Sequence, residues 1–129
     1  MGVFLHVFFS TKRRRLLKRT SVDAERLLRE LARSPDLAPF GELVKPLVEQ
    51  DLARRSDLVR TLRAFFAAGG NASEAADRLF LHRNSMLYRL ERIQRLTGLD
   101  VKDPRVALTL QLGLLSLEER EEPDETEHP

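Results

Sequence analysis

The residues of this chain best suited to binding chemistry lie on one face of a predicted helix over residues 83–97. At about 100° per residue, the side opposite the apolar residues carries side chains that donate and accept hydrogen bonds: Asn84, Tyr88, Glu91, Arg92 and Arg95. Arginine pairs with guanine and asparagine with adenine at base edges in the major groove of DNA. The spacing therefore predicts a recognition helix, and a merely solvated polar face is the alternative interpretation.

The residues before this helix are those that a helix-turn-helix requires. A shorter helix is predicted over residues 72–79, and the tight turn Phe80-Leu81-His82 joins it to the helix over 83–97. Asn71 is a favourable N-cap for the shorter helix, and Glu74 stands where a capping-box partner belongs. Small alanines on its apolar side allow two helices to approach closely. The alternative is an alanine-rich helical hairpin that binds nothing.

Four further helices are predicted from apolar spacing and from residues that end helices. They cover residues 23–33, 40–50, 57–68 and 104–117. The first carries an apolar stripe, made of Leu27, Leu28 and Leu31, and Pro46 is expected to kink or to start the second. The predicted fold class is therefore all-α. It is a small helical domain around a helix-turn-helix, preceded by short helices and followed by an apolar C-terminal helix.

The C-terminal helix over 104–117 is more apolar than one buried face requires. Apolar residues cover roughly two-thirds of its circumference, which indicates burial on more than one side. Leu108, Leu112 and Leu115 lie together on one of these sides. Two interpretations stay open: this side contacts a second copy of the chain, or it is buried within the monomer.

Composition excludes several kinds of chemistry. The chain of 129 residues has no cysteine, which excludes disulfides and thiol catalysis and fits a reducing cytoplasm. Its three histidines are far apart, so no metal site is expected. No nucleophile–base set, phosphate-binding loop or pair of catalytic carboxylates stands out. We expect neither catalysis nor a cofactor.

Charge is segregated along the chain and suggests how it is organised. The net charge is +2, yet residues 118–129 hold seven acidic residues and one arginine, so the preceding residues are strongly basic. A basic body suits a polyanion such as nucleic acid, and solvated surface arginines are the alternative. Residues 22–118 are predicted to be the folded domain, and residues 119–129 an acidic disordered tail. Residues 1–21 form an apolar and basic segment, whose apolar part is too short to span a membrane. They are interpreted as an isolated strand-like piece or as a remnant of an upstream domain.

A series of ordered segments between residues 57 and 117 carries a family resemblance. The segments include Gly69-Gly70-Asn71, Leu79-Phe80, His82-Arg83-Asn84-Ser85, Tyr88-Arg89-Leu90 and Asp103-Pro104. The series resembles the C-terminal DNA-binding domain of the purine-catabolism and carbohydrate-diacid regulator (PucR/CdaR) family of bacterial transcription factors. Its helix-turn-helix core is similar to that of the nucleoid protein Fis. Weaker similarity extends back to about residue 22.

The resemblance implies a DNA-binding site on the helix-turn-helix. It implies that Asn71 and Ser73 contact the DNA backbone. It places a further set of side chains along the groove: His82, Arg83, Asn84, Ser85, Tyr88 and Arg89. Arg92 joins them because it lies on the same polar face. Arg89 is near the edge of that face, which favours a phosphate contact, and His82 has the alternative role of capping the helix.

The function expected from these residues is sequence-specific DNA binding by a transcriptional regulator. The expected partners are double-stranded DNA and a second copy of the chain, and the expected location is the cytoplasm, at the nucleoid. The alternative is an interaction module that pairs with a full-length relative and modulates it. The resemblance implies effector-binding regions before this domain in family members, and no small-molecule effector or membrane contact is expected on this chain.

Overall fold

The computed structural model describes residues 23–121, with side chains up to residue 118. Residues 1–21 and 122–129, for which an upstream remnant and an acidic tail are expected, lie outside the described residues, whereas residues 119–121 of the expected disordered tail are helical. All regular structure within the described range is helical, which confirms the all-α expectation. After helical residues 23–33, the elements are η2 (Pro35–Leu37), α2 (Ala38–Arg54), α3 (Leu58–Ala67), α4 (Ala72–Arg78), α5 (Arg83–Thr97) and α6 (Pro104–Glu121).

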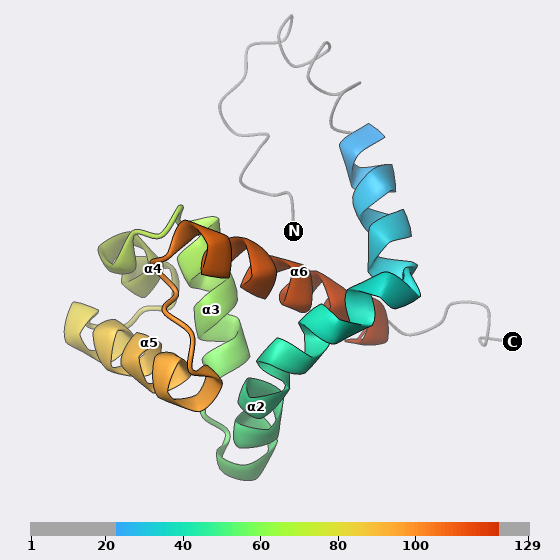
Figure 1. Ribbon diagram of the computed structural model, residues 1–129. Coiled ribbons are helices and arrows are strands. Elements are labelled where there is room, and N and C mark those ends of the chain that lie inside the picture. The colour runs from blue at the N-terminus through green and yellow to red at the C-terminus, as the bar shows by residue number, and fades with distance from the viewer. Residues whose placement is uncertain (1–22, 122–129) are drawn as a thin grey trace, which may run out of the picture.

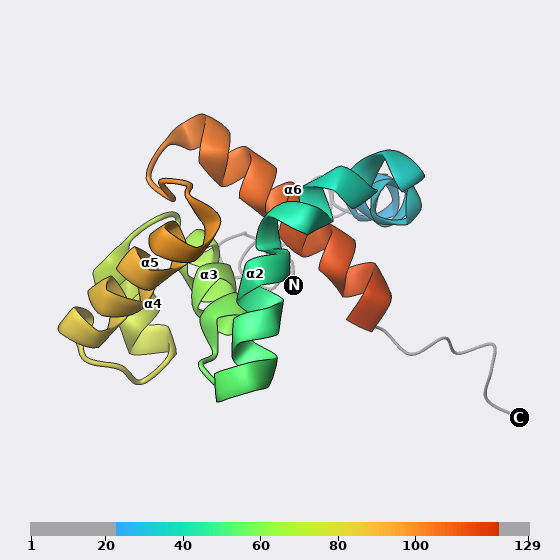
Figure 2. The ribbon, with the colours of Figure 1, turned by 60° about the horizontal axis from the view of Figure 1, so that its bottom comes forward.

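The helices form two groups that meet at α3. The long helices α2 and α6 cross and pack against each other, while α4 and α5 pack together on the other side of α3 (Figures 1 and 2). The helical residues 23–33 project from the end of α2 that is far from α5 (Figure 1). The helix-turn-helix is therefore supported by α3, which contacts both α4 and α5, and by α2, which contacts α5.

One core joins the helices from α2 to α6. It is made mainly of leucine, valine and alanine side chains that are almost completely inaccessible to solvent: Val44, Leu47, Leu58, Leu62, Phe65, Ala75, Ala76, Met86, Leu90, Ile93, Val101, Leu110, Leu114 and Leu117. Burial of each large apolar side chain stabilises the fold by about 1.5–3 kcal/mol. The core residues of α5 are thus fixed against α2, α3 and α4, which sets the direction in which its opposite face points.

The crossing of α2 and α6 depends on glycine. A Cβ atom at Gly113 would lie 2.5 Å from the backbone oxygen of Phe40, closer than real Cβ contacts. On the facing helix, a Cβ at Gly41 would meet the Ser116 side-chain oxygen at 3.0 Å. The two helix backbones approach this closely because Gly113 has no side chain.

Helix α2 is longer than the sequence indicates. It runs from Ala38 to Arg54 with Pro46 inside it, whereas the expected segment covered only residues 40–50. No helix starts at Pro46, and the axis of α2 bends along its length (Figures 1 and 2). Proline removes one backbone hydrogen bond from a helix. Val44 and Leu47, on either side of Pro46, are both fully buried, so packing holds the helix together across it.

The first predicted helix forms without its expected burial. Residues 23–33 are helical and end before Ser34, whose side-chain oxygen accepts a hydrogen bond from the Asp36 backbone N–H at 3.2 Å. However, Leu27, Leu28 and Leu31 are 59%, 49% and 37% exposed, so this stripe adds nothing to the described core. None of the described helices is long and apolar enough to cross a membrane.

Candidate nucleic-acid interface

The shorter helix of the unit, α4, begins at the predicted cap. The Asn71 side-chain oxygen accepts a hydrogen bond from the Glu74 backbone N–H at 3.0 Å. The reciprocal half of a capping box is not formed. The Asn71 backbone N–H donates to the Ala68 oxygen instead, and the Glu74 carboxylate pairs with Arg78 at 3.3 Å. Asn71 and Ser73 are both exposed at this end of α4.

The turn between α4 and α5 is tight because one residue adopts a left-handed conformation. Phe80 has a φ of +56°, which is uncommon for a residue other than glycine. The Leu81 backbone N–H then donates to the Ala76 oxygen at 2.8 Å, which satisfies the end of α4 in the manner of a Schellman motif. Phe80 is 94% exposed, while Leu81 packs against the core. The turn thus fixes where α5 starts.

Helix α5 is capped by His82 and has the two faces that its sequence predicts. The His82 Nδ1 atom accepts a hydrogen bond from the Asn84 backbone N–H at 3.0 Å, so this histidine caps the helix. Met86, Leu90 and Ile93 are buried on one side. Asn84 and Tyr88 are exposed on the other, where the tyrosine has 58% of its surface accessible. The polar face of α5 therefore points to solvent.

Two candidate DNA-binding residues contact each other. The Arg83 Nε atom donates a hydrogen bond to the Ser73 hydroxyl oxygen at 3.1 Å, and both side chains are exposed. This contact links the first turn of α5 to the first turn of α4. Arg83 consequently lies over α4, and its remaining guanidinium donors are open to a ligand at the junction of the two helices.

Arg89 is anchored on α3 beside the predicted polar face. Its guanidinium donates to the Thr61 hydroxyl at 3.2 Å, and the hydroxyl of this buried threonine donates to the Asp57 backbone oxygen at 2.7 Å. Arg89 is half-buried, as expected for a residue at the edge of the polar face. A fixed guanidinium in this position is suited to meeting a phosphate group.

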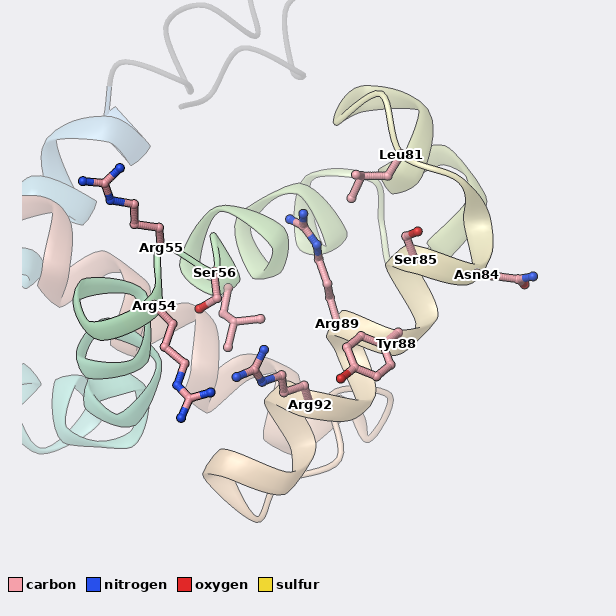
Figure 3. A pocket seen from close by; sticks show the side chains of 10 residues that line it. Arg54, Arg55, Ser56, Leu81, Asn84, Ser85, Tyr88, Arg89 and Arg92 are labelled. Atoms are coloured by element: carbon pink, nitrogen blue, oxygen red, sulfur yellow. The ribbon is translucent and has the colours of Figure 1, made fainter.

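Tertiary packing places a second set of polar residues opposite α5. An open groove of about 690 Å³ runs between the end of α2 and the exposed side of α5 (Figure 3). Its lining includes five of the predicted site residues: Asn84, Ser85, Tyr88, Arg89 and Arg92. Arg54, Arg55 and Ser56 line its other side and were not predicted. The sequence signal for this side was the basic pair Arg54-Arg55. Because the helix was expected to end at residue 50, this pair fell in a loop with no assigned role.

Asp51 holds this unpredicted side of the groove in place. Its carboxylate accepts hydrogen bonds from the backbone N–H groups of Leu58 at 2.7 Å and Val59 at 3.0 Å. The same carboxylate accepts the Ser56 hydroxyl at 2.8 Å. A carboxylate at a helix N-terminus satisfies unpaired donors and interacts favourably with the helix dipole. The connection from α2 to α3 is thereby fixed, and Arg54 and Arg55 with it.

The groove is basic as well as open. Three of its lining arginines, Arg54, Arg89 and Arg92, lie along it, and no aspartate or glutamate lines it. The side chain of Arg55 points away from α5 and adds no charge to the space between the two walls (Figure 3). Within the described residues, no group of three or more His, Cys, Asp or Glu side chains is placed to hold a metal ion. The chemistry offered by this surface is therefore hydrogen bonding and positive charge, which suits a polyanion.

A short capped helix, a tight turn and a longer helix with an exposed polar face define a helix-turn-helix domain. Comparison with known families agrees: residues 58–116 match the PucR C-terminal helix-turn-helix domain. Residues 58–116 therefore form a helix-turn-helix domain of the PucR C-terminal type, as the sequence resemblance implied.

Curated relatives share this part of the chain. The purine catabolism regulatory protein of Bacillus subtilis is 37% identical over 93 residues, which are 71% of this chain and 17% of the relative. The carbohydrate diacid regulator of Escherichia coli is 39% identical over 81 residues, or 62% of this chain and 21% of the relative. The proline-responsive transcriptional activator PutR of Bacillus subtilis is 28% identical over 74 residues, which are 57% of this chain and 18% of the relative. The chain thus spans about a fifth of the length of these relatives. No solved structure matches it significantly.

Proposed function

We propose that this chain is a transcriptional regulator that binds DNA sequence-specifically, with α5 lying in the major groove. The observation that carries the proposal is the exposed polar face of α5, which follows the turn at Phe80 and lies opposite the buried residues Met86, Leu90 and Ile93. The names of the relatives support a regulatory role over a catalytic one. Because those names refer to different compounds, they assign no effector to this chain. A DNA-binding role places it at the nucleoid, in the cytoplasm.

The predicted site residues fall into two roles on this proposal. Asn84, Ser85 and Tyr88, exposed on the first turns of α5, face base edges. Asn71 and Ser73 meet the DNA backbone beside α4, and Arg89 and Arg92 meet phosphates along α5. Arg83, held by Ser73, lies where base and backbone contacts adjoin. His82 acts through its cap on the Asn84 backbone N–H and so sets the position of α5.

The division of roles predicts different mutational effects on selected and random DNA. Asn84→Ala and Arg83→Ala should each weaken binding to the preferred site by about 1–3 kcal/mol and have little effect on random DNA, because base contacts specify the sequence. Ser73→Ala should weaken binding to both kinds of DNA to a similar extent. The measurement is fluorescence anisotropy on a duplex selected from a random library and on a scrambled duplex. A uniform loss for all three variants would contradict the assignment of base-reading residues.

We further propose that the regulator binds as a homodimer through α6. A two-part DNA site requires two recognition helices about 34 Å apart, hence two copies of the chain. Leu108 of α6 is 59% exposed. Leu112 and Leu115 are half-buried, and neither belongs to the described core. These three leucines form the apolar surface offered to the second copy.

Replacing two of these leucines tests the dimer. Leu108→Glu together with Leu112→Glu should give a folded monomer, because the charges are tolerated in solvent and not in an apolar interface. Sedimentation equilibrium measures the mass, circular dichroism checks the fold, and binding to a two-part site should weaken at least tenfold. Leu52→Glu, at a leucine that is 81% exposed on α2, is the matched control and should stay dimeric. A double variant that is folded and still dimeric would place the interface elsewhere.

A further inference from the structure

The groove beside α5 contains two arginines that face each other from different helices. Arg54 comes from the last turn of α2, and Arg92 comes from α5. Figure 3 shows their guanidinium groups pointing toward one another across the groove, while the Arg55 side chain points away from α5. No carboxylate side chain lines the space between them. Among the described residues, neither guanidinium has a hydrogen bond or ion pair.

Two facing cations repel each other unless an anion lies between them. In this protein the arrangement does not result from a flexible loop, because Asp51 fixes the end of α2 to the start of α3 through its bonds to Leu58 and Val59. On the other side, Arg89 ties α5 to Thr61 of α3. Both walls are thus fixed to the same helix, so their separation is fixed as well. The helices that carry Arg54 and Arg92 are therefore held in place by contacts within the protein itself.

We propose that Arg54 and Arg92 together hold a phosphate of the DNA backbone, so that α2 extends the interface beyond the helix-turn-helix. This inference rests on the proposed function. The groove is continuous with the face of α5 that carries Asn84, Ser85 and Tyr88, since these residues line it too. When α5 lies in the major groove, a sugar–phosphate strand must pass along the side of this helix. The facing arginines lie on that side.

The first test compares two neighbouring arginines of equal charge. The slope of log affinity against log salt concentration should become about 0.9 less steep per bound chain in the Arg54→Gln variant. This corresponds to a loss of DNA affinity of roughly tenfold at 0.1 M salt. The loss should be equal on selected and scrambled DNA, because a phosphate contact carries no sequence information. Arg55→Gln is the matched control, since its side chain points away from α5, and its slope should stay close to that of the unaltered chain. Equal losses of DNA affinity in the two variants would show that only the overall charge of the protein matters, and would overturn the proposal.

The second test asks whether the two arginines share one phosphate. If they do, the single variant Arg92→Gln and the double variant Arg54→Gln/Arg92→Gln should lose similar DNA affinity. The reason is that one substitution already breaks the shared contact, so the second has little left to remove. Strictly additive losses would overturn a shared site. Thermal unfolding of each variant identifies any loss of fold, and Arg54→Lys, which keeps the charge, should recover part of the affinity in a folded protein.

A third measurement separates a DNA phosphate from a free one. Ethylation of individual backbone phosphates should reveal a position that blocks binding of the unaltered chain and not of the Arg54→Gln variant. Inorganic phosphate at constant ionic strength should leave the melting temperature of both proteins nearly unchanged. A different result would contradict our inference: phosphate raises the melting temperature, Arg54→Gln abolishes this rise, and the variant binds DNA as the unaltered chain does. That result would identify a site for a small anion. Absence of DNA binding by the unaltered chain would overturn the proposed function itself.

Discussion

Raising the salt concentration from about 50 to 200 mM should weaken DNA binding by roughly 10³–10⁵-fold, if a dimer neutralises about six to ten phosphates. Each neutralised phosphate releases counterions, so the logarithm of the affinity falls with the logarithm of the salt concentration at a slope of about −0.9 per contact. The arginines of the groove, Arg54, Arg89 and Arg92, and the residues at the start of α4 supply several contacts in each chain. Anisotropy titrations at four or more salt concentrations measure the slope.

Salt must act on the complex and not on the fold for this result to be informative. Its control is a thermal melt at each salt concentration. The melting temperature should change little, because the ion pairs Glu42–Lys45, Asp57–Arg60, Glu74–Arg78 and Glu91–Arg95 join exposed side chains, and such pairs contribute little to stability. A slope near zero would show that phosphates are not the ligands of the basic residues. That outcome would remove the main support for a DNA interface of this size.

Gly113→Ala should destabilise the protein by about 2–3 kcal/mol, the largest effect expected from any single methyl group in this fold. The added Cβ would lie 2.5 Å from the Phe40 backbone oxygen, so α2 and α6 would have to separate along their whole contact. In a domain of this size, the melting temperature should fall by roughly 10–20 °C. Circular dichroism during heating or urea unfolding measures the change.

Gly41→Ala, across the same interface, is the matched control. Both substitutions favour the helix by about 1 kcal/mol, because alanine has the higher helix propensity, so the difference between them isolates the clash. The Gly41 Cβ would meet the Ser116 side-chain oxygen at 3.0 Å, and that side chain can rotate away, whereas the Phe40 carbonyl is part of a helix backbone. Equal stabilities of the two variants would mean that α6 packs on α2 differently from the arrangement in Figure 2.

The parts of the fold that local residues determine were predictable from the sequence. The helix expected over 83–97 coincides with α5, because His82 caps its start and Gly98, with a φ of +73°, ends it. Asn71 likewise marks the start of α4. The apolar spacing of Met86, Leu90 and Ile93 was sufficient to orient α5, since a helix buries its apolar stripe in the core. Caps and periodicity act within a few residues and therefore leave a clear signal.

The remainder depends on contacts between residues that are distant in the chain. Pro46 stays inside α2 because the core holds its neighbours, so no helix starts at the proline, although the axis of α2 bends along its length (Figure 2). The groove forms because α2 ends opposite α5, and no local pattern near Arg54 shows what it will face. The stripe of Leu27, Leu28 and Leu31 has helical spacing and remains exposed, since spacing indicates an apolar face and not what covers it.

The contacts of the site residues were also beyond sequence analysis. Arg83 bonds to Ser73, and Arg89 bonds to Thr61, 28 residues earlier in the chain. Each contact depends on the angle at which two helices cross. Residue types could identify which side chains belong to the polar region, and only the packed helices show which of them are held in place.

Methylation interference tests most directly whether α5 lies in the major groove. Dimethyl sulfate modifies the N7 atom of guanine, which lies in the major groove, and the N3 atom of adenine, which lies in the minor groove. On a duplex selected from a random library, we expect methylation of particular guanines to block binding, and Arg83→Ala or Asn84→Ala to alter which bases matter. Interference confined to adenines, or no selected sequence at all, would contradict a recognition helix in the major groove.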